Sequence, residues 1–195
     1  MKRIGKLLQE SLFYEVVVTD KHGMVLQRIS APSKSYCKAW NQTVYALNRH
    51  SGTYIKDITG TDRWISYAST CLRAYSLVGE LYGILVGKGS TPVTIDDYRL
   101  ESPCGEGTGT DQFEHQDTYH TNPAVVGSDC SFTIRRTLIN NSRATIYGIR
   151  EIGCYIVLDW SPRYYGLGYR DVLPTPADIP DGGAITVTYT IKVTA

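Results

Sequence analysis

The chain has 195 residues, with 20 Lys and Arg against 19 Asp and Glu, and a formal net charge of +1. This near balance argues against partners recognised by bulk charge, such as nucleic acid or an anionic membrane surface. There is no apolar run of about 18 residues, and Gln9, Glu10 and Ser11 interrupt the basic start, so neither a membrane span nor an export signal is expected.

The first elements are an N-terminal arm and a hairpin. Residues 1–13 are expected to form an arm or a short amphipathic helix, because Ile4, Leu7, Leu8 and Leu12 recur near helical spacing. Residues 14–19 and 24–29 favour two strands joined by a turn at 20–23.

One helix is expected, over about residues 35–48. Its apolar face would hold Tyr36, Cys37, Trp40, Val44 and Leu47. Ser33 or Ser35 would cap its first turn, because a serine hydroxyl can accept a hydrogen bond from a free backbone amide there. Short strands are expected after it, at about 54–60, 64–67, 72–77 and 81–86.

The next stretch is polar and holds the best metal-type side chains. Asp96 and Asp97 are expected to serve a local turn, since calcium needs more oxygens than one adjacent pair supplies. Residues 104–129 are rich in Gly, Thr, Asp and Gln, and predict a long loop. Weak candidates for a divalent metal lie in this loop: His115, Asp117 and His120.

Strand character returns at 131–140 and 145–158. In the first of these, Phe132, Ile134 and Leu138 share one face, and the nearby Arg135, Arg136 and Arg143 favour a solvated basic group. In the second, Gly148 and Gly153 predict a bulge or a close backbone approach.

An aromatic stretch, 160–169, is expected to form a loop before a Pro-rich connection. Its candidates for contact with a partner protein or a glycan are Trp160, Tyr164, Tyr165 and Tyr169. Packing over a sheet edge is the alternative interpretation.

The last stretch, 181–195, has the clearest pattern. Ile185, Val187, Tyr189, Ile191 and Val193 alternate strictly with Thr and Lys. This alternation is typical of a half-buried strand in an antiparallel sheet. With one helix, many short strands and no internal repeat, the chain predicts a mainly β fold, an antiparallel β-sandwich or jelly-roll-like domain over 14–195.

The five cysteines are widely spaced and form no Cys-x-x-Cys pair, which favours reduced, mostly buried thiols over a zinc or redox motif. No catalytic motif stands out, so no enzyme activity and no cofactor are expected.

Several segments together resemble a group of structural proteins from tailed-phage virions. They are Asp57–Gly60 after a helix, Gly87–Pro92 leading to Asp96–Leu100, Glu151–Gly153, Arg170–Pro174 and Gly183–Ile191. The resemblance implies a non-enzymatic β-rich subunit of a capsid, neck or tail, made in the host cytoplasm and located in the virion. Its partners would be further copies of itself and other virion proteins, with neither membrane nor nucleic acid bound directly.

The contacts in such a particle are expected from the terminal strand, the N-terminal arm and the 105–129 loop. Two alternatives stay open from the residues. One is a carbohydrate-binding module for host attachment that uses the aromatic stretch. The other is a metal-dependent hydrolase that uses the His115–His120 segment.

Overall fold

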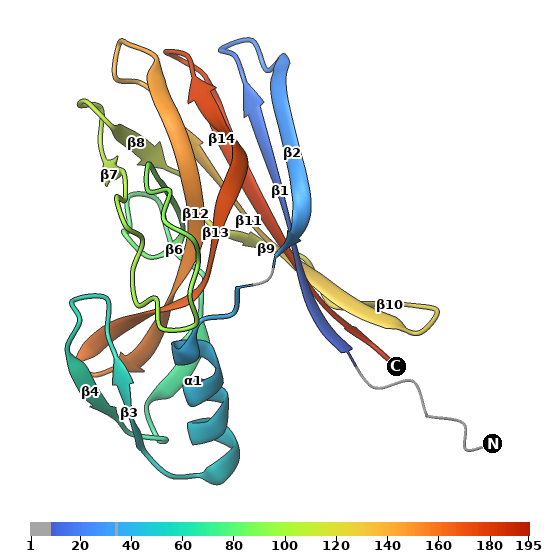
Figure 1. The fold of residues 1–195 in the computed structure, drawn as a ribbon, viewed down its shortest axis with the longest axis vertical. Helices are drawn as coiled ribbons and strands as arrows, with labels where there is room; N and C mark the ends of the chain where they lie inside the picture. The colour runs from blue at the N-terminus through green and yellow to red at the C-terminus, as the bar shows by residue number, and fades with distance from the viewer. Residues whose placement is uncertain (1–8, 34) are drawn as a thin grey trace.

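The computed structural model describes residues 9–33 and 35–195, and shows two β-sheets packed face to face (Figure 1). Most described residues lie in strands, and there is one α-helix. The mainly β, sandwich-like fold expected from the sequence is therefore confirmed.

The larger sheet has eight strands, and β14 lies at its centre. The strand order is β2 (Val25–Ser33), β1 (Gln9–Thr19), β14 (Ala184–Thr194), β11 (Asp129–Ile139), β8 (Gln112–His115) and β7 (Gly105–Glu106). Two further short strands, β9 (Tyr119–His120) and β10 (Ala124–Val126), pair with β11. Neighbours are antiparallel except β7 and β8.

The smaller sheet is built on the longest strands. β12 (Ile146–Trp160) pairs along one edge with β13 (Arg163–Ile179), and along the other with β5 (Thr70–Arg73) and β6 (Gly83–Gly87). A separate hairpin, β3 (Thr53–Lys56) and β4 (Asp62–Ile65), lies beside the helix at one end of this layer (Figure 1).

The alternating terminal segment is the strand β14, as predicted. Ile185, Val187 and Tyr189 are fully buried, whereas Val193 near the strand end is 44% exposed. β14 pairs with β1 on one side and with β11 on the other, so both of its edges are already occupied. The expectation that this strand offers contacts to a partner is therefore wrong for edge-to-edge pairing.

The core fills the space between the sheets and continues behind β12. The rings of Tyr169 on β13 and Tyr189 on β14 meet edge to face between the sheets, with centroids 4.6 Å apart. A second cluster covers the outer side of β12 and contains Cys37, Tyr82, Leu85, Leu100, Tyr155, Val157 and Leu167. Burial on both faces explains why 152–158 is a continuous apolar run and does not alternate.

The single helix, α1 (Lys38–Arg49), begins later than predicted. Neither serine caps it: the N-cap is Cys37, which makes no side-chain capping bond, and the Lys38 amide donates to the Ile95 carbonyl at 2.9 Å. Its buried residues are Ala39, Thr43 and Ala46, while Leu47 is 43% exposed. The predicted apolar face is correct at its start, where Cys37 is buried and Tyr36 and Trp40 pack against the core. It is wrong at Leu47, and the small residues Ala39, Thr43 and Ala46 are the buried ones within the helix.

Three other boundaries need correction. The expected N-terminal helix is wrong for residues 9–12, which belong to β1, and residues 1–8 lie outside the described part of the chain. The expected loop over 104–129 contains β7, β8, β9 and β10. The aromatic stretch is also no loop, because Trp160 ends β12 and Arg163 begins β13 directly after a tight turn.

The proline-rich connection after it remains part of β13. Pro174 and Pro176 are tolerated there because β13 pairs only with β12 and lies at the edge of its sheet. Gly148 has a φ of +74° beside a register shift, and a Cβ on Gly153 would lie 2.8 Å from Leu100, so the predicted bulge and close approach are both present.

All five cysteines are free, with Cys37, Cys104 and Cys154 buried and the other two half-buried. Within residues 9–33 and 35–195, no helix has the length and apolar character needed to cross a membrane.

Candidate functional site: an apolar surface around Trp160

The predicted metal residues do not assemble into a site. His115 is buried on β8, whereas His120 on β9 lies beside the Tyr75 ring, with centroids 6.1 Å apart. The Asp117 carboxylate accepts a hydrogen bond of 2.7 Å from the Val78 amide. In the described part of the chain, no three His, Cys, Asp or Glu side chains gather as metal ligands would.

The four predicted aromatic contact residues have very different surroundings. Tyr169 is completely buried in the core, so its assignment to a contact surface is wrong. Tyr165 is half-buried and stacks on Tyr82, with centroids 5.2 Å apart. The Arg63 guanidinium covers the Tyr164 ring at 4.7 Å.

Trp160 is the member of the set that is well exposed, at 45%. Its ring carries two guanidinium groups, from Arg73 at 4.7 Å and from Arg163 at 4.3 Å. A sugar would need an open ring face for stacking, and these cations compete for the faces of the indole. A Trp–Arg cluster is instead characteristic of residues that dominate protein–protein contacts.

Trp160 lies near other exposed apolar side chains, on the segment between β5 and β6, that the sequence did not reveal. Arg73 also lies 5.5 Å from the centroid of Tyr75, and Arg163 forms an ion pair of 3.7 Å with Glu80. These links connect the hairpin turn after β12 with the segment between β5 and β6. We call the combined feature the Trp160 surface; its exposed apolar members are Tyr75 (42%), Leu77 (48%), Val78 (62%), Leu81 (55%) and Trp160.

The backbone beneath this surface is held by one buried cation, Arg136 on β11. The Arg136 side chain is fully buried and lies among backbone carbonyls of the segment that carries Leu77 and Leu81. Its guanidinium donates five hydrogen bonds of 2.7–3.2 Å, to the carbonyls of Leu77, Glu80, Tyr82, Ile84 and Gln116.

These bonds fix the backbone of the segment on which Leu77 and Leu81 are exposed. Burial lowers the pKa of Arg136 to about 10, so the group stays charged at neutral pH. The basic group around Arg135 and Arg136 was expected to be solvated, and this is wrong for Arg136. The alternation of Phe132, Ile134 and Leu138 could have placed Arg136 on the buried face. Arg136 follows Ile134 and precedes Leu138 by two residues, and residues two apart in a strand share one face.

His115 lies in the same buried region, with an unusual environment. A carboxylate oxygen of Glu106 is 3.1 Å from Nδ1, yet neither ring nitrogen makes a well-formed hydrogen bond with the described residues. Burial and the nearby Arg136 charge lower the pKa of His115 to about 4. The imidazole is therefore neutral in the folded protein.

A second buried ionic cluster pins residues 88–103 over the outer side of β12. Glu151 is fully buried, and its carboxylate accepts backbone amides from Gly89, Glu101 and Ser102 at 2.6–3.1 Å. Arg170 donates to the same carboxylate at 2.9 Å and to Asp97 at 2.9 Å. Because every charge in this cluster has a partner, it is explained by the fold alone.

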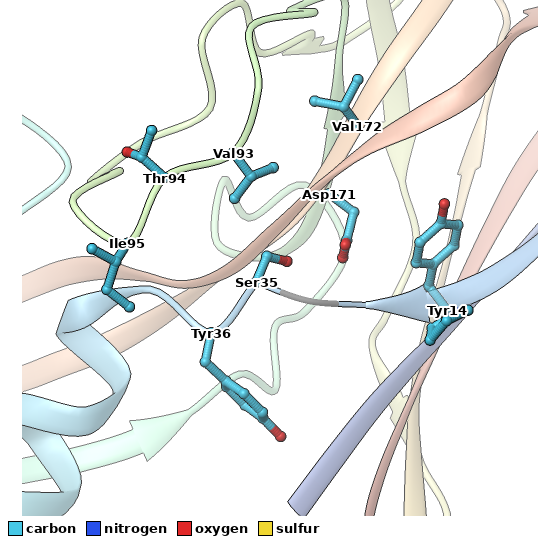
Figure 2. A pocket seen from close by; sticks show the side chains of 9 residues that line it. Tyr14, Ser35, Tyr36, Val93, Thr94, Ile95, Asp171 and Val172 are labelled. Carbon is cyan, nitrogen blue, oxygen red and sulfur yellow. The ribbon is translucent and has the colours of Figure 1, made fainter.

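Two hollows lie on either side of this cluster. The pocket in Figure 2 has a volume of about 300 Å³ and contains the Asp171 carboxylate, which accepts a hydrogen bond of 3.1 Å from the Tyr189 hydroxyl behind it. A smaller polar pocket of about 180 Å³ lies between α1 and β3–β4. Its lining is Lys38, Ala39, Gln42, Tyr54, Lys56, Asp62, Asp96, Asp97 and Tyr98.

No known protein family matches this sequence, and no curated protein and no solved structure matches it either.

Proposed function

We propose that the protein is a non-enzymatic structural subunit of a phage particle, and that copies of the chain associate through the Trp160 surface. The resemblance to tailed-phage virion proteins supports the particle and the virion location. The β-sandwich-like fold is compatible with both.

The exposed apolar cluster on a fixed backbone carries the proposal. Contiguous apolar side chains cost solubility in a monomer, and larger patches commonly mark interaction sites. Trp, Tyr and Arg, which form the centre of this surface, are enriched at protein contacts. The net charge of +1 leaves little long-range repulsion between copies.

The experiment compares the mass of the native assembly in two matched variants. Val78→Ser with Leu81→Ser changes two exposed side chains of the surface, so the fold should persist while the assembly dissociates to smaller species. The control, Val25→Ser with Leu26→Ser, changes two residues of similar exposure on β2, which are each 50% exposed.

Native mass spectrometry and sedimentation velocity provide the readout. An unchanged assembly in the Val78–Leu81 variant would refute the surface. A wild-type chain that stays monomeric at all concentrations, and does not co-sediment with particles, would refute the role in assembly.

Carbohydrate binding is the second candidate function. The pocket beside α1 favours it at that position and not at the aromatic stretch 160–169. The polar pocket beside α1 has Tyr54 for stacking, together with the Asp62 carboxylate and the Gln42 amide for sugar hydroxyls. A glycan-array screen tests it with Tyr54→Ala and, as control, Tyr147→Ala, since both tyrosines are more than half exposed. Glycan binding that is lost in Tyr54→Ala but kept in Tyr147→Ala would support a glycan site in this pocket. If the wild-type protein binds no glycan on the array, the proposal of a glycan site is refuted.

A further inference from the structure

A larger pocket lies beside the Trp160 surface, between α1, β5 and the larger sheet. Its volume is about 500 Å³, within the ~300–1,000 Å³ range of small-molecule sites. The lining comes from α1, from β5 and the residues after it, and from the inner face of the large sheet. These residues are Trp40, Leu72, Arg73, Ala74, Tyr75, His120, Phe132, Ile134 and Ile191.

The pocket is apolar along its floor and continues along the sheet as a strip. Ile134 and Ile191 on the floor are 4% and 8% exposed, and Phe132 pairs with Ile191 across the strands. One step further along the same face, Cys130 pairs with the exposed Val193. A pocket that leads into an apolar strip fits an elongated hydrocarbon better than a compact ring.

One cation lies at the pocket without an acidic partner. The Arg73 side chain donates from Nε to the Tyr75 carbonyl at 3.2 Å. Among the described residues, no carboxylate lies within ion-pair distance of its guanidinium, although Arg163 nearby has Glu80. Its remaining donors are suited to a planar, two-oxygen anion.

The other basic side chain in the lining is His120. Burial lowers the pKa of His120, so its imidazole is neutral at pH 7 and does not add to the positive charge. The Arg73 guanidinium is therefore the positive charge in the lining that can pair with an anionic head group of a ligand.

We propose that this pocket binds a small amphipathic carboxylate, such as a medium-chain fatty acid. The hydrocarbon chain lies along Phe132, Ile134 and Ile191, and the carboxylate meets the Arg73 guanidinium. Burial of the hydrocarbon chain supplies most of the affinity, and the head group sets the orientation. Arg73 and Tyr75 belong both to this pocket and to the Trp160 surface, and the binding test does not require that copies of the chain associate.

Isothermal titration calorimetry of the wild-type protein provides the test, with decanoate as probe. Decyltrimethylammonium has the same chain with the opposite charge, and acetate has the head group alone. Decanoate should bind saturably, the cation at least about tenfold more weakly, and acetate without saturation. Equal affinity for decanoate and the cation would overturn the role of Arg73, and no saturable decanoate binding would overturn the site.

Two variants separate head from tail. Arg73→Gln should weaken decanoate about tenfold, and Arg150→Gln, an exposed arginine on β12, should leave the affinity unchanged. Phe132→Ser should weaken decanoate and the cation together, and its thermal melt reports whether the fold persists.

Vesicles distinguish a free acid from a lipid surface. Binding to vesicles with anionic lipid, without binding of free decanoate, would overturn the small-ligand assignment. Val78→Ser with Leu81→Ser, which disrupts the proposed assembly surface outside the pocket, should still bind decanoate.

Discussion

Replacing Arg136 by Met should destabilise the protein strongly and release the segment under the Trp160 surface. Methionine has a similar length but no donors, so five backbone carbonyls lose their partner. Each bond to a charged donor is worth about 1.5–3 kcal/mol, and part of this sum is offset because burying the guanidinium itself has a desolvation cost. We expect a net loss of about 3–5 kcal/mol in the free energy of unfolding.

Urea denaturation measures this loss. With a urea slope of about 2 kcal/mol/M, the midpoint should fall by about 2 M. Hydrogen exchange should also become faster in residues 76–82 before other parts of the chain, because three of the five released carbonyls belong to this segment. Arg136→Lys should lose less, since lysine keeps the charge and three of the donors.

The neighbouring arginine is the matched control. Arg135 is exposed and lies over the Tyr119 ring at 5.2 Å, so Arg135→Met removes the same charge at a cost below about 1 kcal/mol. Equal midpoints for Arg136→Met and Arg135→Met would refute the idea that Arg136 holds the segment.

Three further outcomes follow from buried groups. His115 has a folded pKa of about 4 against an ordinary 6.5, so the unfolded chain binds the proton first and stability should fall by up to about 3 kcal/mol from pH 6.5 to 4. His115→Phe should flatten that part of the urea-midpoint profile, and an unchanged slope would contradict the assignment. Glu151→Gln should cost about 3 kcal/mol because Arg170 loses its buried anion, whereas Glu15→Gln on β1, where the side chain is 42% exposed, should be near neutral in the same assay. Burial raises the pKa of three thiols to about 12, so a thiol reagent at neutral pH should label Cys71 and Cys130 before Cys37, Cys104 and Cys154; equal rates for all five would refute this order.

The sequence was sufficient for elements whose pattern is local. The alternation from Ile185 to Ile191 predicted β14 because each side of that strand has a single environment. The same rule failed for β12 and β13, which are buried on both faces. Glycines inside β13 were taken for loop signals. Gly166 instead lets Leu158 approach, since a Cβ there would lie 2.9 Å from the leucine side chain.

The candidate surface was only partly predictable, for a physical reason. Trp160 was found by its chemistry, but Leu77, Val78 and Leu81 lie on a segment whose backbone is bound by Arg136, more than 50 residues away. A buried arginine that binds carbonyls has no local signature, because its partners come from distant parts of the chain. The short strands β8 and β9 were missed for a similar reason, since their register is set by β11 further along the chain.

The central position of β14 has a consequence for synthesis of the chain. During synthesis, β1 and β2 are made first and β11 much later. The strand that pairs with both β1 and β11 is β14, and it leaves the ribosome after them. Until β14 is made, the facing edges of β1 and β11 have unpaired backbone groups in the nascent chain. Deletion of residues 184–194 would therefore separate β1 and β2 from β11 and its neighbours, and would not simply remove an edge strand.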